Sequence, residues 1–158
     1  MKKVISFLMS IILIISVFSF NALAITETKT HLENKDITYF ENGSYIITTI
    51  VEDTTLTRAT NTKSGQKTSS YYNSDDEIQW SAVLKGTFTY NGSSSTCTTS
   101  NITYTTYVSN WKIPSATATK NSNKAIGNVT AKRYLLGIPV QTIEKTITLT
   151  CSATGTLS

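Results

Sequence analysis

The clearest feature of the chain is a regular alternation of apolar and polar residues. From Ile78 to Tyr90 every even-numbered position is apolar or glycine, and the odd-numbered positions are polar except Val83. Successive side chains of a β-strand point to opposite faces, so this stretch predicts a long strand with one buried face. The stretch Val140 to Ser152 alternates in the same way. Its apolar side carries Ile143, Ile147, Leu149 and Cys151, and Lys145 interrupts it.

Turn signals and a change of parity mark further strands. Asn91-Gly92 ends the first long strand, and a bulge is expected near Ser100-Asn101, where the apolar parity changes. Glu41-Asn42-Gly43-Ser44 is expected to join residues 37–40 to residues 45–51 as a hairpin, because Asn-Gly tolerates the positive φ angles of a tight turn.

Three more segments complete the predicted strand pattern. Trp111 to Ala118 is expected to be a strand, interrupted or placed at a sheet edge by Pro114. Lys124 to Leu135 is expected to be the next strand. It would reach the final strand through Leu136-Gly137-Ile138-Pro139.

The spacing of these strands predicts an all-β fold. About six or seven short strands in roughly ninety residues favour an antiparallel β-sandwich that is immunoglobulin-like in architecture. An inward Trp80 beside inward Cys97 and Cys151 would suit such a core, although Trp80 precedes both cysteines in the chain. A small open barrel is the alternative.

The chain divides into three predicted parts: residues 1–24, 25–66 and 67–158. The first has a basic start, an apolar run from Val4 to Phe20 and the small-x-small motif Ala22-Leu23-Ala24, which together predict a cleaved signal peptide. The apolar run is just long enough to span a bilayer, so an uncleaved anchor is the alternative. We expect a secreted, extracellular protein with no stable membrane anchor after cleavage.

Residues 25–66 form an acidic segment before the predicted sandwich domain of residues 67–158. Ile25 to Asp36 shows no periodicity, and Glu52 to Gln66 has almost nothing to bury, so it is expected to be a linker after the hairpin. The sequence leaves open whether the segment is a pro-segment, a spacer or part of the fold.

Charge is distributed unevenly between the two halves of the mature chain. Residues 25–77 hold nine acids and five bases, whereas residues 78–158 hold seven bases and one acid. The second half therefore favours anionic surfaces, unless its charges are merely a solvated surface. The bases are not clustered as a nucleic-acid interface requires, so no nucleic-acid partner is expected.

Cys97 and Cys151 are the only cysteines. In an exported protein an even pair predicts a disulfide, worth about 4 kcal/mol for a loop of this length in the entropy model. A redox-active or metal-bound pair is the alternative, but the close CxxC-like spacing of such sites is missing.

The residues needed for catalysis are scarce. The one histidine, His31, lies in the aperiodic tail, which excludes a Ser-His-Asp or Cys-His arrangement in the predicted domain. Acids there are limited to Glu144 and the adjacent Asp75-Asp76-Glu77, which lack the alternating spacing of a calcium loop. We expect no enzyme, no cofactor and no metal.

Two clusters are candidate binding surfaces: Tyr71 with Tyr72, and Lys132-Arg133-Tyr134. Neighbouring residues of a strand point to opposite faces, so one member of each is expected outside, where tyrosines beside cations suit glycan stacking or protein contact. The alternative is that the tyrosines pack on the fold. Trp80 and Trp111 are predicted to be core residues.

Several blocks in a fixed order carry a resemblance to a known group of proteins. The blocks are Gln79-Trp80, Gly86 to Ser94, Thr96-Cys97-Thr98, Asn110 to Ile113, Ala131 to Gly137, Val140-Gln141-Thr142, Thr148 to Ser152 and Gly155 to Ser158. Over about residues 58–158 the chain resembles an uncharacterised family of small secreted β-domain proteins from gut Firmicutes, described as hypothetical proteins with no established activity. The resemblance implies export and a compact β domain, and it assigns no functional residue.

These observations favour a secreted, non-catalytic binding or interaction module. Its ligand would be extracellular: cell-wall polymer, host glycoprotein, another copy of the chain or, more broadly, an anionic glycan or a protein. The alternative is a secreted effector, such as an inhibitor or a bacteriocin-like toxin, with residues 25–66 as a pro-segment released near Arg58.

Overall fold

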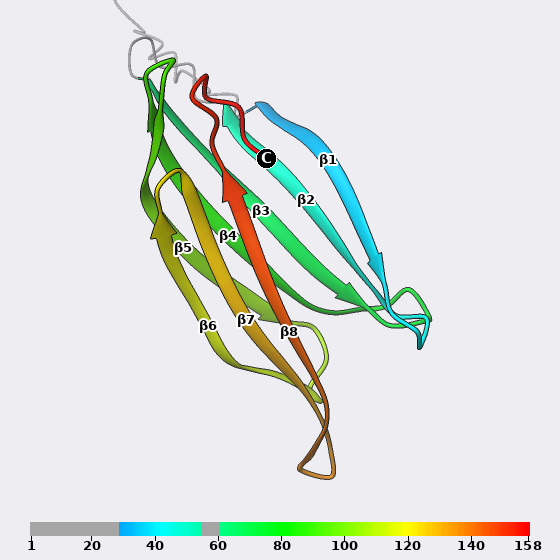
Figure 1. Ribbon diagram of the computed structural model, residues 1–158. Coiled ribbons are helices and arrows are strands. Elements are labelled where there is room, and N and C mark those ends of the chain that lie inside the picture. Colours follow the sequence, from blue (N-terminus) through cyan, green and yellow to red (C-terminus); the bar gives the residue numbers. More distant parts are fainter. Residues whose placement is uncertain (1–28, 55–60) are drawn as a thin grey trace, which may run out of the picture.

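The computed structural model describes residues 29–54 and 61–158, which are all-β and contain no helix (Figure 1). The predicted signal peptide and Arg58 lie outside the described residues. No helix in the described part is long and apolar enough to cross a bilayer. The strands are β1 (Lys29–Tyr39), β2 (Tyr45–Thr54), β3 (Thr62–Tyr72), β4 (Ile78–Tyr90), β5 (Ser95–Thr106), β6 (Trp111–Asn121), β7 (Lys124–Leu135) and β8 (Ile138–Thr150).

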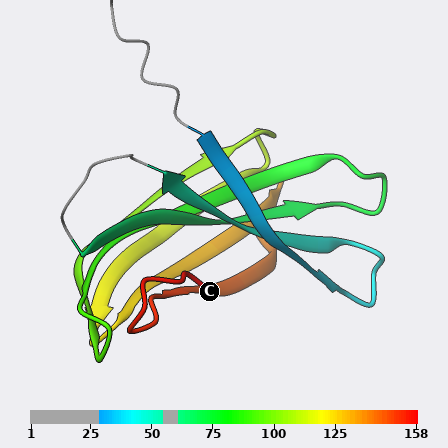
Figure 2. The ribbon, with the colours of Figure 1, turned by 90° about the horizontal axis from the view of Figure 1, so that it is seen from above.

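The strands form two antiparallel sheets that face each other (Figure 2). One sheet has the order β1-β2-β3-β4-β5 and the other the order β6-β7-β8, so every strand pairs with its neighbour in sequence. The predicted all-β class is confirmed. The immunoglobulin-like arrangement is not, because both sheets are simple meanders without the Greek-key connection of that fold.

The core lies between the two sheets. Trp80, Leu84 and Phe88 of β4 are fully buried, and Val129 of β7 and Leu149 of β8 face them from the smaller sheet. The even-numbered positions from Trp80 to Phe88 are all buried, as the alternation predicts, and the odd-numbered Gln79 and Ser81 are buried as well. Trp80 and Trp111 are both core residues, which confirms the prediction for each.

Two glycines let the sheets approach closely. A Cβ atom at Gly127 of β7 would lie 2.7 Å from the Ile102 side chain of β5. One at Gly86 of β4 would lie 2.8 Å from the Phe88 ring of its own strand and 3.1 Å from Ala125 of β7. Real Cβ atoms do not approach other atoms so closely, so any larger residue at either position would push its neighbours apart.

The predicted division after residue 66 is wrong. Residues 62–72 form β3, which pairs with β2 on one side and β4 on the other, so the described ends of the expected linker, residues 52–54 and 62–66, belong to strands. The sequence does not indicate β3, because the strand is polar and only Gly65, Ser69 and Tyr71 are buried. Backbone hydrogen bonds to two neighbours hold such a strand without a run of apolar side chains.

Other boundaries differ by a few residues. β1 begins at Lys29, inside the stretch Ile25 to Asp36 that shows no periodicity in the sequence. The bulge in β5 lies at Thr98, because Cys97 pairs with Phe88 while Thr99 pairs with Thr87. The last turn is the dipeptide Leu136-Gly137, and Pro139 lies inside β8, an edge strand where its missing N–H is tolerated.

The predicted disulfide is also absent: Cys97 and Cys151 are buried free thiols. Their backbone N–H groups donate to the carbonyls of Ser122 and Asn123, so both cysteines flank the β6–β7 turn. Each thiol lies near a backbone carbonyl, Cys97 Sγ at 3.2 Å from the oxygen of Thr99 and Cys151 Sγ at 3.4 Å from that of Ser152. Burial raises the pKa of both thiols.

Candidate functional site

A polar cleft opens at the end of the sheets where the β3–β4 and β5–β6 turns approach β7 and β8. It consists of two adjoining pockets of about 100 and 410 Å³, which share Asn73, Gln79 and Arg133. We call it the end cleft. Its remaining lining residues are Asn42, Ser44, Tyr71, Ser74, Glu77, Val108, Ser109, Asn110, Trp111 and Gln141.

The wall of the end cleft is aromatic on the core side. The Tyr71 ring stacks on Trp80 at 5.7 Å between ring centroids and meets Trp111 edge-on at 5.2 Å. Phe40 from the β1 end adds a further edge contact to Tyr71. Such contacts fix the rings in place, so Tyr71 and Trp111 present rigid edges to the pocket.

Amide side chains on the rim are oriented by hydrogen bonds. Asn73 Oδ1 accepts from the backbone N–H groups of Asp75 and Glu77, and its amide donates to the Glu77 carboxylate at 2.9 Å. Gln79 Nε2 donates to the carbonyl of Glu77 at 3.0 Å. The β3–β4 turn therefore holds its polar groups in a defined geometry beside the pocket.

Arg133 is the cation of the end cleft. Its side chain is exposed, lines both pockets and makes no ion pair with any described residue. Across the smaller pocket, Gln141 Nε2 donates to the Tyr71 hydroxyl at 3.2 Å. A planar guanidinium beside amide donors suits a carboxylate or another planar anion, which it can bind through two parallel hydrogen bonds.

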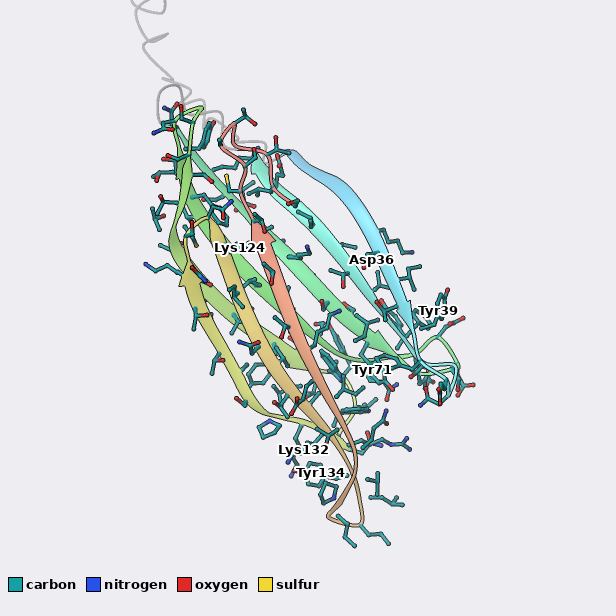
Figure 3. All side chains as sticks on the ribbon, viewed as in Figure 1. Asp36, Tyr39, Tyr71, Lys124, Lys132 and Tyr134 are labelled. Atoms are coloured by element: carbon teal, nitrogen blue, oxygen red, sulfur yellow. The ribbon has the colours of Figure 1, made fainter. Side chains whose placement is uncertain are left out.

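The structure brings together only two of the five predicted surface residues, Tyr71 and Arg133. Tyr71 is buried as a wall of the cleft, whereas Tyr72 stacks on Tyr45 at 5.1 Å on the other side of the sheet. Lys132 and Tyr134 lie toward the protruding β7–β8 hairpin (Figure 3). The expected opposite orientation within each cluster is thus confirmed, but the two clusters do not form one surface.

Gln79, Asn73 and Gln141 are cleft residues that the sequence did not reveal. Gln79 occupies a polar position of the long alternation, where an exposed side chain is expected, yet it is buried. The backbone N–H of Tyr107 in the β5–β6 turn donates to the backbone carbonyl of Gln79, which places this turn beside it. No local pattern encodes that contact.

The end cleft offers little for acid–base chemistry. Glu77 is the one carboxylate among its lining residues, and it is exposed. Asp75, Asp76 and Glu77 lie in a solvated turn, as predicted. In the part of the chain that is described, no group of three or more histidine, cysteine, aspartate or glutamate side chains is placed to hold a metal.

A second hollow, the side groove, runs between β1–β3 and the edge of β8. It has a volume of about 370 Å³ beside Lys35, Asp36 and Lys67 and continues toward Lys145. Burial lowers the pKa of Lys67. The groove arises because the five-stranded sheet extends beyond the three-stranded one, and none of the predicted site residues lines it.

Comparison with known proteins adds no relative. No family model matches the chain, and neither does any curated protein or solved structure.

Proposed function

We propose that the protein is an exported, non-catalytic binding module that takes a carboxylate-bearing sugar unit of an anionic glycan in the end cleft. The observation that carries the proposal is the exposed guanidinium of Arg133, which makes no ion pair with any described residue, beside the fixed edges of Tyr71 and Trp111. Sugars are recognised by aromatic surfaces and amide donors together, and a carboxylate would add the charge-assisted bond to arginine. Export is supported by the signal-peptide pattern of residues 1–24.

The proposal is tested by calorimetric titration with trigalacturonate and with the neutral galactotriose. We expect trigalacturonate alone to bind, and Arg133→Gln to weaken binding roughly tenfold or more, because a charge-assisted hydrogen bond is lost. Arg133→Lys keeps the charge but loses the planar fork of the guanidinium. Its affinity should therefore lie between those of the unaltered chain and Arg133→Gln.

Lys85→Gln is the matched control, since it removes an exposed cation from β4, outside the end cleft. It should leave the affinity unchanged. Absence of binding to either trisaccharide, or equal losses in Arg133→Gln and Lys85→Gln, would contradict the proposal.

The alternative of an effector with a pro-segment receives no support from the fold. Release near Arg58 would remove β1 and β2, and with them Ile46 and Ile50 of the core. The remaining chain would expose the backbone edge of β3 that pairs with β2.

A further inference from the structure

The β7–β8 hairpin ends in an exposed apolar tip. Its side chains are Leu135, Leu136, Ile138 and Val140, which are 61%, 96%, 65% and 53% exposed. A Cβ atom added at Gly137 would meet no atom within 4 Å, so the turn stands in open space. Figure 1 shows the hairpin projecting beyond the other strands.

The residue types of the β7–β8 turn do not favour its backbone conformation. Leu136 has a φ of +49° and Gly137 one of +82°. Asparagine or glycine is preferred at the first of these positions, and a bulky residue there costs about 1–2 kcal/mol. Leucine at this place gains no packing in return, which points to a use outside the folded chain.

Cations and a tyrosine lie behind the tip. Lys132 of β7 pairs with Lys112 of the edge strand β6. The Lys112 ammonium lies 5.2 Å from the centre of the Tyr134 ring. Leucine and isoleucine at the end, a tyrosine behind them and lysines at the base match the layers of a bilayer interface with anionic headgroups.

We propose that the apolar tip inserts into the interface of an anionic lipid bilayer, with Lys112 and Lys132 at the headgroups. The ladder continues to the pair Leu135–Ile138, so the backbone groups between the two strands are paired up to the turn. The groups on the outer edges of this two-stranded tip still need water, which limits the tip to shallow insertion. A second copy meeting tip to tip would oppose like charges, so charge complementarity favours the lipid surface. The proposal goes beyond the end cleft and uses none of its residues.

Flotation with vesicles of equimolar phosphatidylglycerol and phosphatidylcholine tests the proposal. We expect the full mature chain to bind these vesicles, to bind phosphatidylcholine vesicles at least roughly tenfold more weakly, and to release at high salt. The double variant L136S/I138S should bind roughly tenfold more weakly or worse, because it no longer transfers two apolar side chains from water into the bilayer. Lys112→Gln with Lys132→Gln should weaken binding to the anionic vesicles only.

Tyr104→Ser is the matched control, because Tyr104 is 51% exposed on β5, away from the tip. It should bind vesicles as the unaltered chain does. Unchanged circular dichroism and melting temperature would show that each variant is folded. The proposal is overturned if the unaltered chain floats with neither vesicle, if L136S/I138S binds equally well, or if sedimentation without lipid shows a dimer that L136S/I138S abolishes. Trigalacturonate titration of L136S/I138S without vesicles reports on the end cleft alone, so the two proposals fail separately.

Discussion

The hairpins at the two ends of the sequence, β1–β2 and β7–β8, have turns of opposite character. In the first, Asn42 Oδ1 accepts hydrogen bonds from the backbone N–H and the hydroxyl of Ser44, and a Cβ at Gly43 would lie 3.4 Å from Ser74. In the second, Leu136 is almost fully exposed at a positive φ. Both turns use a glycine, but only the first is held by the rest of the molecule.

This difference shows which turn serves folding. Gly43 lowers the cost of the left-handed backbone, and the Asn42 side chain accepts hydrogen bonds from Ser44, so the turn stabilises the hairpin by itself. Leu-Gly does neither. An exposed apolar turn that folding does not need is explained by a contact that the isolated chain lacks.

The largest expected difference in stability is between two alanine variants. Each replaces an isoleucine near the start of the second strand of its hairpin. Ile46 of β2 is 2% exposed and Ile138 of β8 is 65% exposed. Ile46→Ala should lower the free energy of unfolding by about 2–5 kcal/mol, because it leaves a cavity in the core. Ile138→Ala should change it by less than about 0.5 kcal/mol. Urea unfolding followed by circular dichroism measures both, and equal effects would break the comparison.

A smaller effect is expected from exchanging the turn residues themselves. Asn42→Ala should lower the free energy of unfolding by about 1 kcal/mol, since Ser44 loses its acceptor. Leu136→Asn should raise it by about 1 kcal/mol at most, because asparagine tolerates the left-handed backbone better than leucine. Thermal melting of both variants is the measurement. A loss of stability in Leu136→Asn would show that the leucine contributes to the fold.

The smallest effect concerns the hydrogen bond between the β1–β2 and β3–β4 ends. The Tyr45 hydroxyl donates to Asp76 at 2.9 Å, and this bond raises the pKa of Tyr45 above its ordinary 10.0. A raised pKa means that the contribution of the bond is fully present below pH 10 and is lost as the pH rises through the folded-state value. Asp76→Gly, which suits the φ of +63° there, should return the pKa toward 10.0.

The absorbance of phenolate is measured against pH. Tyr45 is one of eight tyrosines, so its pKa change should appear as a shift in about one eighth of the total signal. Asp75→Ala removes the neighbouring acid, which makes no hydrogen bond to Tyr45, and is the control. Identical titration curves for the unaltered chain and Asp76→Gly would disprove the assignment.

Strand positions were predictable where the pattern is local. The alternation from Ile78 to Tyr90 gave β4 with its bounds and its buried face, and Asn42-Gly43 gave the first hairpin. β3 was not predictable, because its partners β2 and β4 supply what its polar sequence lacks. For the same reason the boundary expected after residue 66 falls inside a strand.

The end cleft was half predictable. Tyr71 and Arg133 stood out as an aromatic beside an acidic turn and a cation in a strand, but they are 62 residues apart in the chain. Gln79, Asn73 and Gln141 carried no signal, since their role depends on which turns meet at one end of the sheets.

The sequence by itself determined the all-β class, the buried face of β4 and the first hairpin, because side-chain alternation and turn chemistry act between residues close together in the chain. Only the tertiary structure decided that residues 29–54 belong to the larger sheet, that the two cysteines flank one turn as free thiols, and that Arg133 meets Tyr71 in a cleft. Those outcomes depend on pairing between distant segments, and no local pattern specifies the partner.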